Sequence, residues 1–279
     1  MSGTQVRIGH SPDPDDAFLY YGLTQGKVEL PGIRVRHFLR GIEELNQQAL
    51  AGELEMTAVS LHAYAYCAER YLLLRTGASV GDGYGPVVVT RRAARPEDLR
   101  RMTVAVPGRL TTAALLLRLA VGPVPVQILP FDEIPGAVRE GRVEAGVLIH
   151  EAQITYAEQG LCKVLDLGEW WQKETGLPVP LGVNVLRRDL GEGTLRGLAA
   201  ALRESLDYAM THRAEALEYA QQFGRGLDRG RTERFVGMYV NRWAVDCQPE
   251  AARAMQELLD RSAQMQLVPR RIALEFVEG

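Results

Sequence analysis

The sequence predicts an α/β protein made of two lobes that two strands connect. Short apolar segments that read as strands alternate with helical segments over most of the first 190 residues, a pattern typical of helices packed on a largely parallel sheet. Two stretches, TRRAARPED at 90–98 and PLGVNVLRRDLG at 180–191, look like crossings between two bodies. We therefore expect a larger lobe made of residues 1–92 and 184–279 and a smaller inserted lobe made of residues 93–183.

The composition excludes several classes of protein. The chain has 279 residues, of which 46% are hydrophobic and 24% charged, and this is enough for two modest domains. The net charge of -3 and the scattered Lys and Arg residues predict no nucleic-acid partner. No apolar run approaches the length of a membrane span, and the N-terminus lacks the features of a signal peptide, so we expect a soluble cytoplasmic protein with no membrane partner. The three cysteines show no CxxC spacing, which indicates neither a disulfide framework nor a zinc site.

The individual elements follow from hydrophobic spacing and from turn residues. We expect strands at 5–9, 33–38, 55–60, 86–92, 102–108, 125–130 and 143–149. We expect helices at 17–26, 41–54, from 61 onward, and at 95–100, 109–122, 131–143, 193–223, 229–243 and 249–266. In the SPDPDD loop, Asp15 or Asp16 is the expected helix cap. The helices after residue 193 contain few candidate site residues and are interpreted as scaffold.

The glycines of GDGYG at 81–85 do not indicate a nucleotide site. They precede a strand, whereas the dinucleotide fingerprint follows a strand and opens a helix. We expect them to permit a tight turn or a close approach of the backbone to a ligand.

Four candidate ligand segments stand where predicted strands end. They are Ser11, Ser60, the pair Thr111–Thr112, and His150. In open α/β sheets, ligands bind beyond the carboxyl ends of the strands. The threonine pair in the first turn of a helix suits a carboxylate, although one threonine can equally be only the cap. Ser11 can belong merely to a helix start, and Ser60 can be an N-cap or a ligand contact.

His150 follows a buried strand, VEAGVLI at 143–149. A histidine at the mouth of such a strand suits proton transfer at neutral pH, but a structural histidine is also common there. Glu151 would point to the opposite face of a continuing strand and is not expected to be its partner. A two-lobed clamp can close over a small ligand and exclude water from this residue.

The chain resembles the 1,4-dihydroxy-6-naphthoate synthase family of the futalosine route to menaquinone. The resemblance runs from about residue 6 to past residue 250. It is carried by SPDPDDAF, EELNQQALAGEL, VSLHAYA and VPGRLTTA, and above all by GVLIHEAQITYAEQGL and DLGEWWQKETGLPVPLG. It implies the type II periplasmic-binding-protein fold, with mixed sheets flanked by helices and two hinge strands.

The resemblance also implies an activity and a set of site residues. The activity is that of a lyase that converts cyclic dehypoxanthine futalosine to 1,4-dihydroxy-6-naphthoate, so the partner is a small carboxylate substrate, and no metal or organic cofactor is expected. His150 matches the family's catalytic base. The substrate-binding residues are Ser11, Ala58, Val59, Ser60, Thr111 and Thr112. The oligomeric state is not predicted.

The chain departs from the family's usual residues at three positions. Asp13 and Asp15 stand where Cys and Asn are common, and Ala58 stands where a lysine is common. Exchanging a cation for carboxylates weakens the binding of an anionic substrate. Two alternatives share the fold: chorismate dehydratase of the same pathway, and a binding protein without catalysis, because the fold alone does not assign a reaction.

Several other residues have a structural and a functional interpretation. His10 is a structural histidine or a site contact, and Trp170 and Trp171 pack in the core or stack on an aromatic ligand. His37, His62 and His212 are expected to be surface or packing residues. The acids of the SPDPDD loop suggest helix capping more than a metal site.

Overall fold

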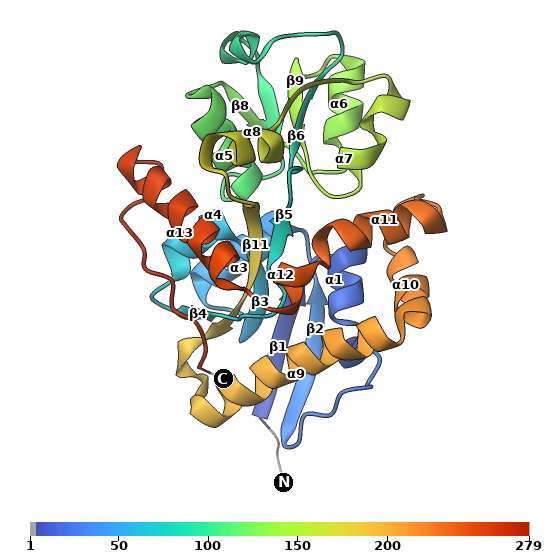
Figure 1. The fold of residues 1–279 in the computed structure, drawn as a ribbon, viewed down its shortest axis with the longest axis vertical. Coiled ribbons are helices and arrows are strands. Elements are labelled where there is room, and N and C mark those ends of the chain that lie inside the picture. Colours follow the sequence, from blue (N-terminus) through green and yellow to red (C-terminus); the bar gives the residue numbers. More distant parts are fainter. Residues whose placement is uncertain (1–3, 279) are drawn as a thin grey trace.

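A computed structural model describes residues 4–278, and its ribbon has two α/β lobes, one above the other in Figure 1. Within these residues the lower lobe contains a six-stranded sheet and the upper lobe a five-stranded sheet. The chain enters the upper lobe between β5 and β6 and returns after α8 through β11. Both termini of the described chain lie in the lower lobe (Figure 1).

The lower sheet has the order β2-β1-β3-β11-β4, and β5 pairs with β11. Its strands are β1 (Thr4–His10), β2 (Ile33–Leu39), β3 (Met56–Ser60), β4 (Tyr71–Leu73), β5 (Ser79–Gly81) and β11 (Val179–Arg187). β1 is parallel to β2 and β3, whereas β11 is antiparallel to β3, β4 and β5. The carboxyl ends of β1 and β3 therefore lie at the same edge of the sheet, and this edge faces the upper lobe.

The upper sheet has the order β10-β6-β9-β7-β8. Its strands are β6 (Val87–Thr90), β7 (Val104–Val106), β8 (Val126–Ile128), β9 (Ala145–Leu148) and β10 (Cys162–Asp166). β7 is parallel to β8 and β9, but β6 is antiparallel to β9 and β10. The sheet expected to be largely parallel is therefore mixed, because β6, which carries the chain into the lobe, runs against its other strands.

Helices cover both sheets. Those before the return strand are α1 (Pro14–Leu19), α2 (Tyr21–Thr24), α3 (Ile42–Ala51), α4 (Leu61–Cys67), η1 (Pro96–Arg101), α5 (Thr112–Val121), α6 (Ile134–Glu140), α7 (Ala152–Thr155), η2 (Tyr156–Gln159) and α8 (Leu167–Thr175). After it come η3 (Arg188–Leu190), α9 (Glu192–Thr211), α10 (Arg213–Gln221), α11 (Arg229–Tyr239), α12 (Arg242–Val245) and α13 (Pro249–Gln264). The predicted helix at 193–223 is thus two helices that separate at His212, and that at 229–243 separates after Tyr239.

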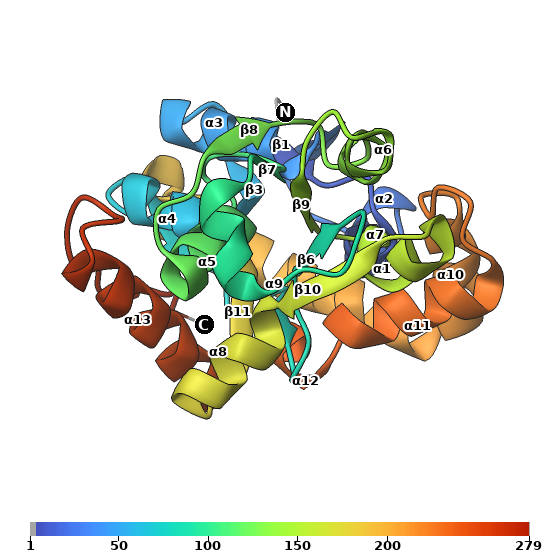
Figure 2. The ribbon, with the colours of Figure 1, turned by 90° about the horizontal axis from the view of Figure 1, so that it is seen from above.

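One hydrophobic cluster runs through both lobes. It joins Val59 and Tyr64 of the lower lobe to Leu115 and Val147 of the upper lobe, and all four are 0% exposed. Figure 2 shows why: α4, α5 and α8 lie together on the side where β11 returns. The lobes are therefore packed together on this side.

At the GDGYG segment the backbone closely approaches another part of the chain, whereas an approach to a ligand stays a prediction. A Cβ on Gly85 would lie 2.8 Å from the backbone nitrogen of Gly168, and one on Gly168 would lie 2.2 Å from the carbonyl oxygen of Tyr84. Only glycine fits where the strand entering the upper lobe crosses the start of α8.

The predicted lobe boundaries remain a prediction, which the sheets help to refine. Because β6 pairs only within the upper sheet and β11 only within the lower one, we propose crossings at residues 82–86 and 176–178. No helix in the described part of the chain is long and apolar enough to cross a membrane.

Candidate functional site

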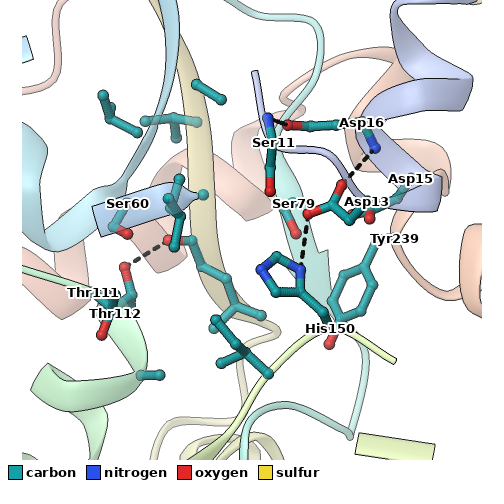
Figure 3. Close-up of a pocket in the computed structure, with 18 of the residues that line it drawn as sticks. Ser11, Asp13, Asp15, Asp16, Ser60, Ser79, Thr111, Thr112, His150 and Tyr239 are labelled. Atoms are coloured by element: carbon teal, nitrogen blue, oxygen red, sulfur yellow. Dashed lines mark hydrogen bonds and ion pairs between the residues drawn. The ribbon is translucent and has the colours of Figure 1, made fainter. Parts of the chain in front are cut away.

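A cavity of about 110 Å³ lies between the lobes. The lower lobe contributes the loop before α1, the end of β3, β11 and α11, and the upper lobe contributes the start of α5 and the turn after β9. Each of the seven residues predicted to contact the substrate lines it: Ser11, Ala58, Val59, Ser60, Thr111, Thr112 and His150. The residues that the sequence predicted as substrate contacts therefore line one cavity (Figure 3).

The two lobes meet at an ion pair between His150 and Asp13. The His150 Nδ1 atom lies 2.9 Å from the Asp13 Oδ2 atom, and the two side chains are 14% and 3% exposed. A carboxylate only accepts hydrogen bonds, so Nδ1 carries the hydrogen. The other ring nitrogen, Nε2, has no hydrogen-bond partner among the residues that the structure describes. The pair thus fixes the tautomer and leaves Nε2 free, toward the cavity in Figure 3.

The backbone of His150 is held in an unusual conformation. Its φ of 53° lies in the left-handed region, which costs on the order of 1 kcal/mol for a residue other than glycine. With the Gln153 amide oriented to satisfy both of its polar atoms, the amide oxygen accepts a hydrogen bond from the His150 N–H at 3.0 Å. The Phe131 ring packs edge-on against the imidazole, with ring centroids 4.7 Å apart. His150 therefore stands in a tight turn after β9, and its side chain points into the cavity.

The pKa of His150 is raised above its ordinary value. Burial alone would lower it, but the Asp13 carboxylate outweighs burial by charge and by hydrogen bonding. In turn, His150 and further hydrogen bonds hold the pKa of Asp13 below its usual range despite burial. Asp13 therefore favours the imidazolium over the neutral imidazole.

Two more carboxyl groups stand beside this pair. Burial and the negative charge of Asp13 raise the pKa of Asp16 to about 8 and that of Asp15 well above its ordinary value. Asp16 accepts a hydrogen bond from the Ser11 N–H at 2.7 Å. One loop therefore holds one ionised carboxylate, which is Asp13, and two carboxyl groups that favour the protonated form at neutral pH.

The cap of α1 is Asp13, and neither Asp15 nor Asp16 has this role. Its side chain accepts from the Asp16 N–H at 3.2 Å, and Pro14 occupies the first helical position. The expected cap was wrong by two or three residues, because the helix begins at the second proline.

The threonine pair has a different role from the one expected for its hydroxyl groups. Thr111 caps α5 by accepting from the Ala114 N–H at 3.3 Å, and it donates to the Gly108 carbonyl at 2.9 Å. Thr112 donates to the Leu181 carbonyl at 2.6 Å. Neither hydroxyl hydrogen is therefore left for a ligand. The donors that remain are the backbone N–H groups of Thr112 and Ala113 in the first turn of α5, which have no partner within the helix.

Ser60 stands at the N-cap position of α4, but its side chain does not cap the helix. Its hydroxyl oxygen accepts from the Asn46 amide at 3.1 Å, and its N–H donates to the Asn46 oxygen at 2.8 Å. The hydroxyl hydrogen remains available to the cavity. Ser11 is 2% exposed, and its hydroxyl has no partner within residues 4–278, so it too can bond a ligand.

Sequence reasoning missed several residues that line the cavity. Tyr239 and Phe235 come from α11, which was interpreted as scaffold. The Tyr239 hydroxyl lies 2.8 Å from a polar atom of the Gln153 amide in the upper lobe. Asn184 on β11 donates to the Gly77 carbonyl at 2.9 Å. The one available signal was a polar Asn184 within an otherwise apolar strand.

The other singled-out aromatic residues are structural. His10 stacks on Tyr20 with ring centroids 4.3 Å apart and does not line the cavity. Trp171 is fully buried, and its ring N–H donates to the Pro178 carbonyl at 3.1 Å. Trp170 packs against the same core, so neither tryptophan stacks on a ligand in this cavity. His62, a predicted packing residue, is buried, with its Nδ1 atom 3.3 Å from the Thr111 carbonyl oxygen.

Asp13, Asp15 and His150 each offer a polar atom within 4.8 Å of the others. Because Nδ1 carries the hydrogen that bonds Asp13, the lone pair of the neutral imidazole is on Nε2. The expectation that no cofactor is needed stays a prediction.

Comparisons with known proteins agree with this architecture. A family model described as menaquinone biosynthesis matches residues 6–264. A curated protein of Thermus thermophilus named 1,4-dihydroxy-6-naphthoate synthase is 44% identical over 254 residues, which are 91% of this chain and 92% of that protein. A protein of the same name from Streptomyces coelicolor is 39% identical over 276 residues, 96% of each chain.

Solved structures have the same fold. A crystal structure of a protein from Archaeoglobus fulgidus matches with a TM-score of 0.91 and 45% identity, covering 95% of this chain and 98% of that chain. The alkanesulfonate-binding protein of Xanthomonas axonopodis pv. citri matches with a TM-score of 0.71 at 15% identity, covering 98% and 96%. The expected periplasmic-binding-protein fold is thus confirmed, and the chain belongs to the menaquinone-biosynthesis family.

Proposed function

We propose that this protein is a 1,4-dihydroxy-6-naphthoate synthase, a lyase that converts cyclic dehypoxanthine futalosine to 1,4-dihydroxy-6-naphthoate, with His150 as its catalytic base. Two relatives that share 44% and 39% of its residues carry the name of this enzyme. The observation that carries the proposal is the pairing of His150 with Asp13 across the cavity, which leaves Nε2 free. A solute-binding protein needs no such base, so this pair favours catalysis over capture.

The proposed role of the pair follows from its hydrogen bond. In the neutral imidazole, Nδ1–H donates to Asp13, so the lone pair is on Nε2. Nε2 removes a proton from the bound cyclic substrate, and fragmentation begins from the resulting anion. Asp13 stabilises the imidazolium that forms, as the carboxylate does in other His–Asp pairs. General-base catalysis of this kind contributes about 10²–10⁴-fold to the rate.

We propose that the substrate lies with its carboxylate at the start of α5. The first-turn N–H groups and the helix dipole favour an anion there, and no lysine or arginine lines the described cavity. The Asp15 and Asp16 carboxyl groups and Ser11 come from the lower lobe and lie on the same side of the cavity as His150 of the upper lobe. Neutral acids and a hydroxyl suit the polar hydroxyl groups of a sugar-derived ring. Ala58, Val59 and Ser60 line the remaining wall as proposed contacts.

Direct turnover tests the function. The purified protein is incubated with cyclic dehypoxanthine futalosine, and the products are identified by mass spectrometry and ultraviolet absorbance. We expect 1,4-dihydroxy-6-naphthoate to accumulate. A parallel incubation with chorismate is the control: dehydration of chorismate without turnover of the cyclic substrate would contradict the proposal.

A further inference from the structure

We propose that Arg225 is a positioning residue for the base: it clamps the Pro12–Asp13 loop of the lower lobe to the His150–Glu151 turn of the upper lobe, so that Asp13 and His150 meet. This inference rests on the proposed role of His150. It adds a residue to which neither motif nor resemblance pointed, from the loop between α10 and α11.

The contacts of Arg225 surround the pair on both sides. One terminal nitrogen donates to the Pro12 carbonyl at 2.7 Å, one residue before Asp13. The other donates to the two carboxylate oxygens of Glu151 at 3.1 and 3.2 Å, one residue after His150. The guanidinium also lies 4.6 Å from the centroid of the Phe131 ring, the same ring that packs against His150. A single side chain therefore contacts the chain next to each partner and the ring beside the imidazole.

The backbone conformations of Arg225 and His150 support the proposed positioning role of Arg225. Arg225 has a φ of 42° and His150 a φ of 53°, and both values lie in the left-handed region. Non-glycine residues are strained in this region and persist there where surrounding contacts hold them. The Arg225 and Glu151 side chains are 29% and 12% exposed, so their ion pair is shielded from water more than a surface pair is.

A lysine cannot replace this arginine. The guanidinium fork reaches the carbonyl of one lobe and the carboxylate of the other at once, whereas a lysine ammonium is a single point of charge. Arg225→Lys thus keeps the charge near His150 and removes the simultaneous contact with both lobes.

A second arginine of the same region provides a matched control. Arg231 on α11 forms a two-point ion pair with Glu158 of η2, at 2.7 and 2.9 Å, and this pair also joins the lobes. In Figure 1, α7 of the upper lobe lies above α11 of the lower lobe. Glu151 and Glu158, the acceptors of the two bridges, stand just before and just after α7. Arg231 contacts neither Pro12 nor the His150–Glu151 turn. Arg231→Lys therefore weakens an interlobe bridge without touching the base.

The pKa of His150 depends directly on whether Arg225 holds Asp13 against His150. The charged and titratable groups that face His150 from its neighbouring elements are Asp13, Asp15, Asp16, Glu151, Arg225 and Tyr239. The charge of Arg225 by itself lowers the pKa of His150, whereas Asp13 raises it. Loss of the arginine charge alone would thus raise this pKa, and loosening of the Asp13 pair would lower it. The two effects have opposite signs.

The experiment is an NMR pH titration of the His150 ring in the full-length protein without substrate, assigned by the resonance lost in His150→Asn. We expect the pKa of His150 to fall by about one unit in Arg225→Lys and to keep its wild-type value in Arg231→Lys. The acid limb of kcat/KM should move by the same amount. Arg225→Gln is a second variant. It also removes the positive charge, which by itself raises the pKa of His150, so a fall of this pKa in Arg225→Gln must outweigh that rise.

A His150 pKa that stays constant or rises in Arg225→Lys would overturn the proposal, as would equal shifts in the two lysine variants. The titration needs no turnover. If the wild-type protein leaves the cyclic substrate unchanged, the proposed function fails, while the clamp is still judged by the titration.

Discussion

Replacing Asp13 with asparagine tests the pair at the centre of the site. Asp13→Asn keeps the size of the side chain and an oxygen that can accept from Nδ1–H, but it removes the negative charge 2.9 Å from the imidazole. Two unit charges at that distance interact by about 6 kcal/mol at an effective dielectric constant of about 20. This figure is an upper bound, since a nearby opposite charge shifts a pKa by about 1–3 units.

We therefore expect the pKa of His150 to fall by about 1–3 units in Asp13→Asn, because burial is then no longer offset. A weaker base slows proton removal, so kcat/KM on its plateau should fall by roughly tenfold to a hundredfold, within the full general-base contribution of about 10²–10⁴-fold. The acid limb of the profile should move to lower pH. The assay is kcat/KM against pH, alongside the titration of the His150 ring.

Asp15→Asn is the matched control in the same loop. Because burial and Asp13 raise the pKa of Asp15 well above its ordinary value, this change replaces a neutral group by a neutral group. The pKa of His150 should then stay near its wild-type value. An acid limb that does not move in Asp13→Asn, or that moves equally in both variants, would refute the reasoning.

Three further changes test the fold around the site. Gly85→Ala forces a Cβ to 2.8 Å from the Gly168 nitrogen and should lower the free energy of unfolding by about 1–3 kcal/mol; an unchanged urea midpoint would be inconsistent with the close crossing. Thr112→Val removes the hydrogen bond to the Leu181 carbonyl and should cost about 1–3 kcal/mol, whereas Thr112→Ser should keep most of it; equal urea midpoints for the two variants would speak against that bond. Burial lowers the pKa of His10 to about 3, so the unfolded chain binds a proton at this residue below about pH 6.5, whereas the folded chain binds it only below about pH 3. The free energy of unfolding should therefore fall by up to about 1.4 kcal/mol per pH unit on acidification across this window. A His10→Leu variant that is equally acid-sensitive would exclude His10 as the cause.

The sequence best predicted those features that depend on a single strand or helix. Alternating and apolar segments predicted the strands, and the positions of Ser60 and His150 at strand ends followed from them. Because β1 and β3 are parallel, the same edge of the lower sheet brings Ser11 and Ser60 to the cavity. His150 joins them from the turn after β9 of the upper sheet. Local patterns suffice for such features, since the side chains are placed by their own element.

Features that depend on pairing between distant segments could not be predicted in this way. The partner of His150 is Asp13, which hydrophobic spacing marks only as a helix start. The threonine hydroxyls bond carbonyls of Gly108 and Leu181, and nothing in the local sequence indicates these acceptors. Arg225 lies in a polar loop whose contacts exist only when both lobes are in place.

The most direct test of the account is the turnover of cyclic dehypoxanthine futalosine by His150→Asn, measured beside the wild-type protein at matched stability. If Nε2 of His150 removes the proton, kcat should fall by about 10²–10⁴-fold. Turnover close to the wild-type rate would contradict the account, because the pair of His150 and Asp13 would then have no part in the reaction.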